Sequence, residues 1–171
     1  EVDMAKMKAE VTHEYHQREG SSLRDRLFAN VETAAKLGSA TAPLSNLATK
    51  LPGTGVLAEK LLGIAREREL PTFQRRSFVD RMDDRTPTVG VDEAERKALV
   101  FPDTYTNYSD PEIGMAAVRV LEAAGVHVAV PTEVTGSGRP PFSKGFLDLA
   151  RERARHNVAE LAPLVADGWD E

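Results

Sequence analysis

The chain has 171 residues, with 22 lysine and arginine side chains against 27 aspartates and glutamates, which gives a formal net charge of −5. This length suits one ordinary domain with an extension, since domains cluster near about 100–150 residues. Mild acidity and scattered basic residues exclude the basic stripe typical of nucleic-acid binding. Because the chain has no cysteine, it can form no disulfide, thiolate zinc site or ordinary iron–sulfur cluster.

The sequence shows no targeting segment. No apolar run approaches the roughly 20 residues that a membrane span requires, so we expect no transmembrane segment. Residues 1–6 lack the basic start, apolar stretch and cleavage site of an export signal, and the first residue is Glu1. We therefore expect a fragment of a larger cytoplasmic protein, and attachment to the inner face of the membrane through partners stays open.

Apolar residues spaced by three and four predict a series of helices up to residue 64. The first has its apolar stripe on Met4, Met7, Val11 and Tyr15 and ends near Gly20. The second begins at Ser21 or Ser22, whose hydroxyl can cap free amides, and buries Leu23, Leu27, Val31 and Ala34 before Gly38. Two shorter helices flank Pro52-Gly53, and both are too short to be stable alone.

The pattern changes twice in the second half of the chain. From residue 65 to 97 it has no sustained period, which we interpret as a linker lying over a partner. At Ala98 a short apolar run begins that is typical of a buried strand. We therefore predict three parts: a helical connector (1–64), a linker (65–97) and a partial α/β domain of cysteine-rich type that lacks its cysteines (98–171).

The last part has the order strand, helix, strand. The strands are predicted at 98–101 and 126–130. The helix between them starts at Asp110-Pro111, ends at Gly125 and has an apolar face of Ile113, Ala116, Ala117, Val120, Leu121 and Ala124. This order predicts a right-handed parallel crossover. The fold class is thus α/β, a helical connector followed by a partial parallel βαβ, Rossmann-like half-domain.

A long helix is predicted after the second strand. Ser143 can cap it, and its apolar face comprises Phe146, Leu149, Ala150, Ala154, Val158, Leu161 and Val165. Gly168 ends it. A crossover of this kind normally leads into a third strand, and Trp169 is interpreted as the start of one.

Two loops follow the carboxyl ends of the predicted strands, where parallel α/β sheets place their ligands, and we expect them to lie side by side. In the first loop Asp103, Thr104 and Asn107 could hold a ligand or partner, or could form a turn and a helix cap. In the second loop, Arg139, Ser143 and Lys144 follow flexible glycines at a predicted helix N-terminus, a geometry that favours an anion. A tight turn with a helix cap is the alternative, because the nucleotide fingerprints are missing.

No catalytic or metal-binding set is predicted. His13 and His16 could face the same way on a helix, but no third ligand is specified, so we interpret them as surface residues. His127 and His156 have no serine or acid at a spacing typical of a triad and are assigned to structure.

Three stretches carry a family resemblance. Residues 2–10 with 15–18 are similar to the helix after the last Cys-Pro of a two-cluster ferredoxin-like motif. Residues 23–30, 42–46 and 59–64 are similar to a helical connector. Residues 101–108, 111–126, 138–140 and 143–145 look like the start of a cysteine-rich domain. Together they resemble the FAD-linked oxidase family with iron–sulfur and cysteine-rich regions, related to D-lactate, glycolate and anaerobic glycerol-3-phosphate dehydrogenases.

The resemblance implies a role in a larger oxidoreductase acting on a 2-hydroxy acid or glycerol phosphate. FAD and iron–sulfur clusters are then expected in the parent protein or complex, whose flavin-binding and iron–sulfur domains or subunits are the partners, while this chain binds no cofactor. Where the family has Cys-Cys-Gly-Arg-Pro, this chain has Gly136-Ser137-Gly138-Arg139-Pro140. Two other functions stay open, a stand-alone anion- or phosphate-binding α/β module and a helical interaction protein.

Overall fold

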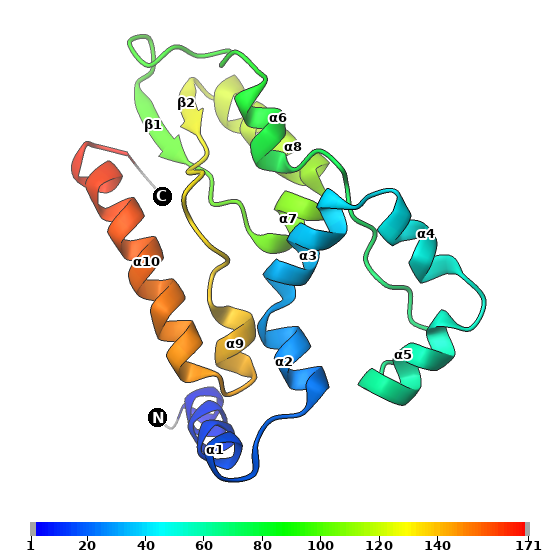
Figure 1. Ribbon diagram of the computed structural model, residues 1–171. Helices are drawn as coiled ribbons and strands as arrows, with labels where there is room; N and C mark the ends of the chain where they lie inside the picture. Colours follow the sequence, from blue (N-terminus) through cyan, green and yellow to red (C-terminus); the bar gives the residue numbers. More distant parts are fainter. Residues whose placement is uncertain (1–2, 170–171) are drawn as a thin grey trace.

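The computed structural model describes residues 3–169, which are mostly helical and include one two-stranded sheet (Figure 1). The first half contains α1 (Met4–Glu19), α2 (Leu23–Ala29), α3 (Val31–Ala40), α4 (Leu44–Lys50) and α5 (Thr54–Leu62). The second half contains α6 (Phe78–Asp83), β1 (Arg96–Leu99), α7 (Thr104–Tyr108), α8 (Pro111–Ala123), β2 (Val126–Ala129), α9 (Arg139–Ser143) and α10 (Leu147–Ala166).

Local capping sets the limits of the first helices. Gly20 ends α1 with a φ of 82°, a left-handed conformation that favours glycine. The Ser22 hydroxyl accepts a hydrogen bond from the amide of Asp25 and starts α2. The single helix predicted from there to Gly38 is instead two helices that meet at Asn30. The helix boundaries follow from local chemistry, but the break at Asn30 has no strong sequence signal.

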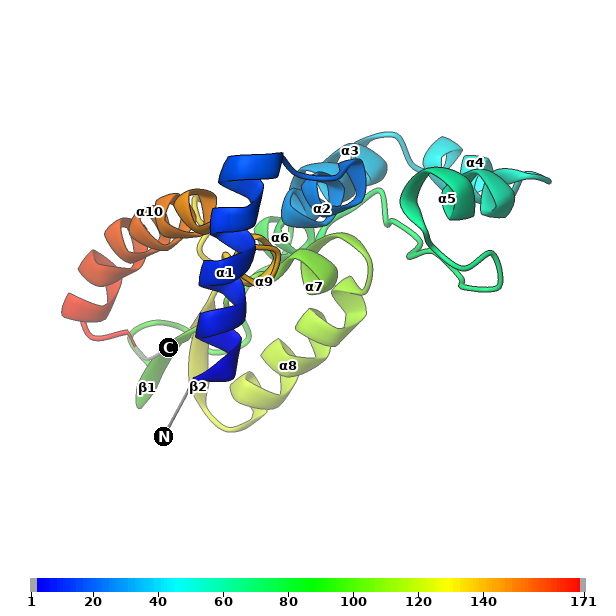
Figure 2. The same cartoon turned by 90° about the horizontal axis from the view of Figure 1, so that it is seen from below.

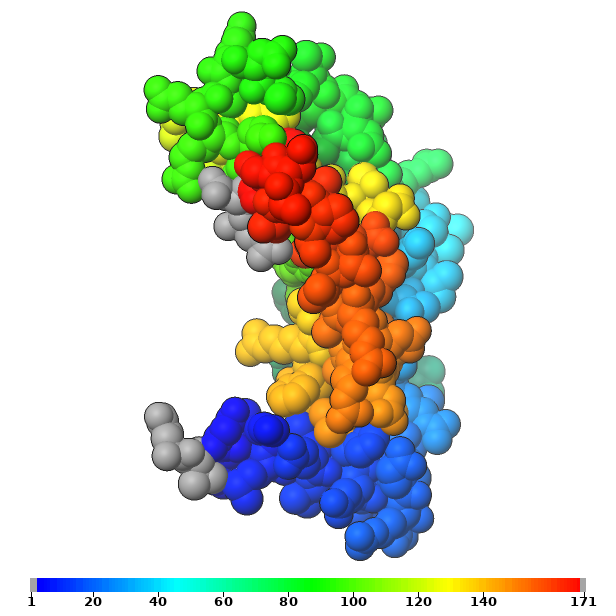
Figure 3. All heavy atoms as spheres, turned by 90° about the vertical axis from the view of Figure 1, so that its left-hand side faces the viewer, coloured from blue at the N-terminus to red at the C-terminus, as the bar shows by residue number. Residues whose placement is uncertain are grey.

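The apolar stripe of α1 does not face the core. Met4 and Val11 are 69% and 66% exposed, whereas Ala9 is buried. Figure 3 shows α1 at the foot of α10, where His13 Nδ1 donates to the carbonyl oxygen of Gly145 at 2.9 Å. Helix α1 therefore packs through the side that carries Ala9 and His13, and its apolar stripe lies outside the core.

β1 and β2 pair in parallel, with register from Arg96 opposite Val126 to Leu99 opposite Ala129. This confirms the predicted parallel pair joined by α8, and Pro111 occupies the first turn of that helix as expected. Successive side chains of β2 face opposite sides of the sheet. Val128 packs with Val118 of α8, whereas His127 lies next to Trp169, just after α10.

The buried face of α8 differs from the predicted one. Ile113 and Val120 are 64% and 69% exposed, while Gly114, Val118 and Glu122 are buried. The reason is a close approach to α6, because a Cβ atom on Gly114 would lie 2.7 Å from the ring of Phe78. The apolar pattern alone cannot show that a glycine defines the inner face.

Phe78 lies within the range predicted as a linker. There Ser77 and Asp80 form a capping box that starts α6. The Phe78 ring is fully buried and forms the core with Val118 and Val128. Residues 65–97 therefore supply a core side chain and the first residues of β1, and the three-part division of the chain stays a prediction.

The long helix predicted from Ser143 is also interrupted. Residue Ser143 ends α9, Gly145 adopts a φ of 73°, and α10 begins after Phe146 with no side-chain cap. Val158 and Val165 of α10 are exposed rather than buried. The turn at Gly145 is needed because α9 packs on α2 while α10 runs back along the sheet (Figure 1).

A buried ion pair joins α8 to the segment after α6. The Glu122 carboxylate is 2.6 Å from Arg85 Nη2 and accepts the amide of Thr88 at 3.2 Å. Burial opposes ionisation of Glu122 most strongly, but the hydrogen bonds from Arg85 and Thr88 together outweigh it and lower its pKa below the ordinary 4.5.

Glu122→Gln is expected to lower the free energy of unfolding by about 1–2 kcal/mol at pH 7. Because the folded pKa of Glu122 is depressed, its stabilisation is present above pH 4.5 and is lost as the pH falls through the folded pKa. Urea unfolding of both proteins between pH 7 and pH 3 measures this. The difference between them should shrink toward pH 3, and a constant difference would contradict an ionised Glu122.

Candidate functional site

A cleft of about 830 Å³ lies beyond the carboxyl ends of the two strands. Pro102 and Thr104 follow β1, and residues 132–135 follow β2. The remaining walls come mainly from α3, the start of α6 and α10. Helix α3 belongs to the N-terminal connector, so the cleft is formed jointly by both halves of the chain.

The two loops expected to be neighbours are neighbours. A Cβ atom on Gly136 would lie 3.1 Å from the Thr104 hydroxyl oxygen, although the residues are far apart in sequence. This proximity follows from the parallel pairing, since both strands deliver their loops to one edge of the sheet. Of the predicted site residues, Thr104 and Asn107 line this cleft.

The polar residues of the first loop are used within the protein. The Asp103 carboxylate caps α7 by accepting the amide of Tyr105 at 3.0 Å. Asn107 is buried, and its Oδ1 accepts the amide of Val79 at 3.1 Å. These contacts match the capping alternative, whereas Thr104 lines the cleft.

The three residues predicted to hold an anion do not share one helix N-terminus. Arg139 starts the five-residue helix α9, whereas Ser143 and Lys144 stand at its C-terminal end. Lys144 Nζ is 3.2 Å from the Asp25 carboxylate and 5.4 Å from the centre of the Phe28 ring. Lys144 is therefore neutralised by α2, and the geometry that favoured an anion there is missing.

Asp25 forms the ion pair with Lys144. The hydrogen bond from the Ser22 hydroxyl is the main reason that the pKa of Asp25 lies below its ordinary 3.8, and Lys144 lowers it further against the effect of burial. Asp25 thus stays ionised at neutral pH and ties α2 to the end of α9. Its role is structural.

Glu32, which lines the cleft, makes a contact that the sequence patterns do not predict. Glu32 Oε1 of α3 accepts the amide of Gly136 at 2.7 Å, and Glu32 Oε2 is 3.4 Å from Arg153 Nη1 of α10. Arg153 is 8% exposed, so this pair is largely shielded from water. We call these three residues the Glu32 junction. It joins the connector to the α/β half through a charge-assisted contact.

Asn157 of α10 binds the loop that leads to Gly136. Its Oδ1 accepts the amide of Thr135 at 2.8 Å, and its Nδ2 donates to the carbonyl oxygen of Thr135 at 3.0 Å. Such paired contacts satisfy the backbone of a loop that has no regular structure. The loop before Gly136 is therefore held in place by α10.

Tyr108 is a cleft side chain whose pKa is shifted. Burial raises its pKa above the ordinary 10.0, and the negative charges of Glu32 and Asp80 raise it further, while a hydrogen bond with Asn107 opposes them. Tyr108 is thus neutral at physiological pH and can donate a hydrogen bond to a bound group. The cleft also carries charges of both signs, including Lys36, Arg75, Glu133 and Glu152.

The junction does not fit an iron–sulfur cluster. The chain has no cysteine, and a Cβ atom on Gly136 would lie 2.9 Å from Glu32 Oε2, so the space beside that loop is already filled. Among residues 3–169, no three His, Asp or Glu side chains come together as metal ligands. The cleft offers polar groups but no cysteine thiol to a bound group.

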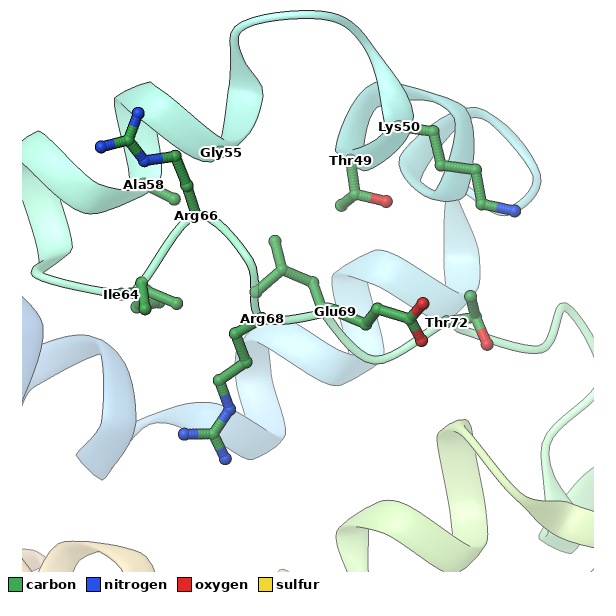
Figure 4. A pocket seen from close by; sticks show the side chains of 11 residues that line it. Thr49, Lys50, Gly55, Ala58, Ile64, Arg66, Arg68, Glu69 and Thr72 are labelled. Carbon is green, nitrogen blue, oxygen red and sulfur yellow. The ribbon is translucent and has the colours of Figure 1, made fainter.

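A second hollow, of about 350 Å³, lies between α4, α5 and the segment up to Thr72 (Figure 4). Arg66 and Arg68 on its rim extend in different directions, and Arg66 Nε is 3.2 Å from the Glu59 carboxylate. This hollow lies away from the strand ends, where parallel sheets place their ligands. We therefore assign the candidate site to the cleft at the Glu32 junction.

Comparison with known proteins connects the chain to dehydrogenases. Over 144 residues it is 27% identical to a subunit of the anaerobic glycerol-3-phosphate dehydrogenase of Escherichia coli (strain K12), an alignment that covers 84% of this chain and 36% of that relative. Over 161 residues it is 27% identical to D-2-hydroxyglutarate dehydrogenase of the same strain, which covers 90% and 16%. The Haemophilus influenzae D-2-hydroxyglutarate dehydrogenase is 26% identical over 175 residues.

These similarities support the FAD-linked oxidoreductase resemblance drawn from the sequence. The chain spans about a third of the length of the glycerol-3-phosphate dehydrogenase relative and about a sixth of the length of D-2-hydroxyglutarate dehydrogenase. No family model matches the chain. No solved structure matches it.

Proposed function

We propose that the chain is a segment of a larger dehydrogenase that oxidises a 2-hydroxy acid or glycerol phosphate. It joins the iron–sulfur region to a half-domain of cysteine-rich type and supplies no redox ligand. The observation that carries this proposal is the similarity to the anaerobic glycerol-3-phosphate dehydrogenase across 84% of the chain. The lack of cysteine in the chain and the filled space beside Gly136 support a structural role.

The chemistry of the parent belongs to its cofactors. FAD and iron–sulfur clusters would take the electrons from the substrate and pass them on. The residues of this chain have a positioning role. Glu32 and Arg153 hold the connector against the strand ends, and Asn157 holds the loop that Glu32 contacts. This contact fixes α3 of the connector relative to the half-domain.

Apolar side chains exposed on the surface favour contact with partner domains. Met4 and Tyr15 of α1 and Leu44 and Leu61 of the α4–α5 pair are 59–71% exposed. In Figures 1 and 2 the α4–α5 pair projects from the rest of the molecule. We propose that flavin-binding and iron–sulfur domains or subunits cover these surfaces. The helical interaction that the sequence leaves open is then part of this assembly and not a separate function.

We propose a cytoplasmic location, with attachment to the inner face of the membrane through the partners. Across residues 3–169, every helix is too short or too polar to cross a bilayer. The anion-binding alternative is less well supported, because Arg139 and Lys144 stand at opposite ends of α9 and Lys144 is paired with Asp25.

Substrate-dependent reduction of an artificial electron acceptor tests the proposed function. The purified parent assembly should bleach its flavin and reduce the acceptor with one of four compounds: glycerol 3-phosphate, D-2-hydroxyglutarate, D-lactate or glycolate. The L enantiomers of lactate and 2-hydroxyglutarate, together with glycerol, are the matched controls. A parent without flavin, or one that responds to none of the four, would contradict the proposal.

A further inference from the structure

The two faces of the sheet are covered by different helices. On one face Val128 packs with Val118 of α8 and Phe78. On the other face the His127 ring lies 5.6 Å from the ring of Trp169, which follows α10. Figure 2 likewise shows α8 and α10 on opposite sides of the strands.

This arrangement determines the edge of the sheet at which a third parallel strand can be added. Connections between parallel strands of one sheet are right-handed in about 98% of cases. The first connection leads from β1 across α8 to β2. A second right-handed connection that uses the opposite face must lead from β2 back past β1, to the far side of β1.

The end of α10 lies where such a connection has to arrive. Lys97 Nζ of β1 donates to the carbonyl oxygen of Asp167 at 3.0 Å and lies 5.3 Å from the centre of the Trp169 ring. Lys97 is the second residue of β1, so the chain returns to the amino end of this strand. A segment continuing from there would run parallel to β1.

The outer edge of β1 has groups that can pair with such a segment. The amide of Val100 donates to the carbonyl oxygen of Ala129 at 2.9 Å. Because peptide groups alternate along a strand, Ala98 also faces β2, whereas the peptide groups of Lys97 and Leu99 point away from it. Two strands alone make a marginal sheet, and three or more are normally needed.

A hollow lies beside the carboxyl ends of the two strands. It has a volume of about 450 Å³ and lies between the sheet and α10, lined among others by Leu99, Ala129, Leu164 and Trp169. The similar dehydrogenase polypeptides are much longer than this chain, so more polypeptide is available in proteins of this kind.

We propose that the outer edge of β1 pairs with a third, parallel strand supplied by the parent polypeptide directly after α10, giving the order β2-β1-β3. The inference needs the larger protein of the proposed function but none of its chemistry. Side chains of this strand would face the two sides of the sheet alternately, so apolar residues are expected on both of its faces. The α/β half then has at least three strands.

Residue-resolved hydrogen exchange of the full-length parent protein tests this proposal. The amides of Lys97 and Leu99 should be as protected as those of Ala98 and Val100. In a form truncated after residue 171, Lys97 and Leu99 should exchange on the order of 100-fold faster while Ala98 and Val100 change little. Protein concentration is varied to detect pairing with a second copy.

Three results would overturn the proposal. One is fast exchange of Lys97 and Leu99 in the full-length protein. Another is protection of the outward amides of β2, at Val128 and Val130, in place of those of β1, which would put the new strand on the other edge. The third is protection that depends on protein concentration. If the truncated form does not fold, the full-length pattern decides alone. Because the readout is independent of activity, it separates this proposal from the proposed function.

Discussion

Gly114→Val is expected to lower the free energy of unfolding by about 2–4 kcal/mol. Even a Cβ atom at this position would meet the Phe78 ring at 2.7 Å, and this ring is fully buried at the centre of the core. The ring cannot move without opening the contact among α6, α8 and β2. Urea unfolding followed by circular dichroism measures the effect.

The matched control is Ala117→Val on the exposed part of the same helix, which should change stability by no more than about 0.5 kcal/mol. Phe78→Leu combined with Gly114→Ala should lose less than the sum of the two single changes, because the smaller side chain makes room for the added methyl group. Equal effects of Gly114→Val and Ala117→Val would show that α6 and α8 do not pack as described.

Glu32→Ala is expected to lower the free energy of unfolding by about 2–4 kcal/mol. It removes the acceptor of the Gly136 amide and leaves the guanidinium of Arg153, whose side chain is 9% exposed, without its carboxylate. The Glu32 side chain is 22% exposed. Solvent screening therefore places the expected destabilisation at the lower end of the range that is typical of broken buried ion pairs. Urea unfolding of Glu32→Ala and of the exposed Lys36→Ala on the same helix provides the comparison.

A double-mutant cycle with Arg153→Ala isolates the pair. The two changes together should destabilise by about 1–2 kcal/mol less than their sum, because removing both charges leaves neither one unpaired. Additive effects would mean that Glu32 and Arg153 do not interact, and the junction would then rest on the Gly136 amide alone.

The parts of the fold that follow from local chemistry could be predicted from the sequence. Gly20 and Ser22 mark helix ends because their conformations and hydrogen bonds depend on neighbouring residues only. Parallel pairing of the strands follows from their order with α8 between them, and it brings Thr104 close to Gly136. In each case the information lies within a few residues or in the topology.

The remaining features depend on packing between distant segments. Glu32 and Gly136 are 104 residues apart, and nothing in either local pattern indicates their contact. On α8, Gly114 rather than a large apolar residue faces the core, because the helix comes very close to Phe78. Ser143 and Lys144 were predicted at a helix start, but the turn at Gly145 separates them from α10.

The most direct test of a structural, non-redox role compares the wild-type parent assembly with its Glu32→Ala variant. Iron per protein and the cluster signals in electron paramagnetic resonance should be unchanged, because this segment has no cysteine to ligate a cluster. Substrate-dependent acceptor reduction should fall about tenfold or more, since small misplacements far from the chemistry carry large rate costs. Loss of iron in the variant, or an unchanged rate with the junction broken, would contradict this role.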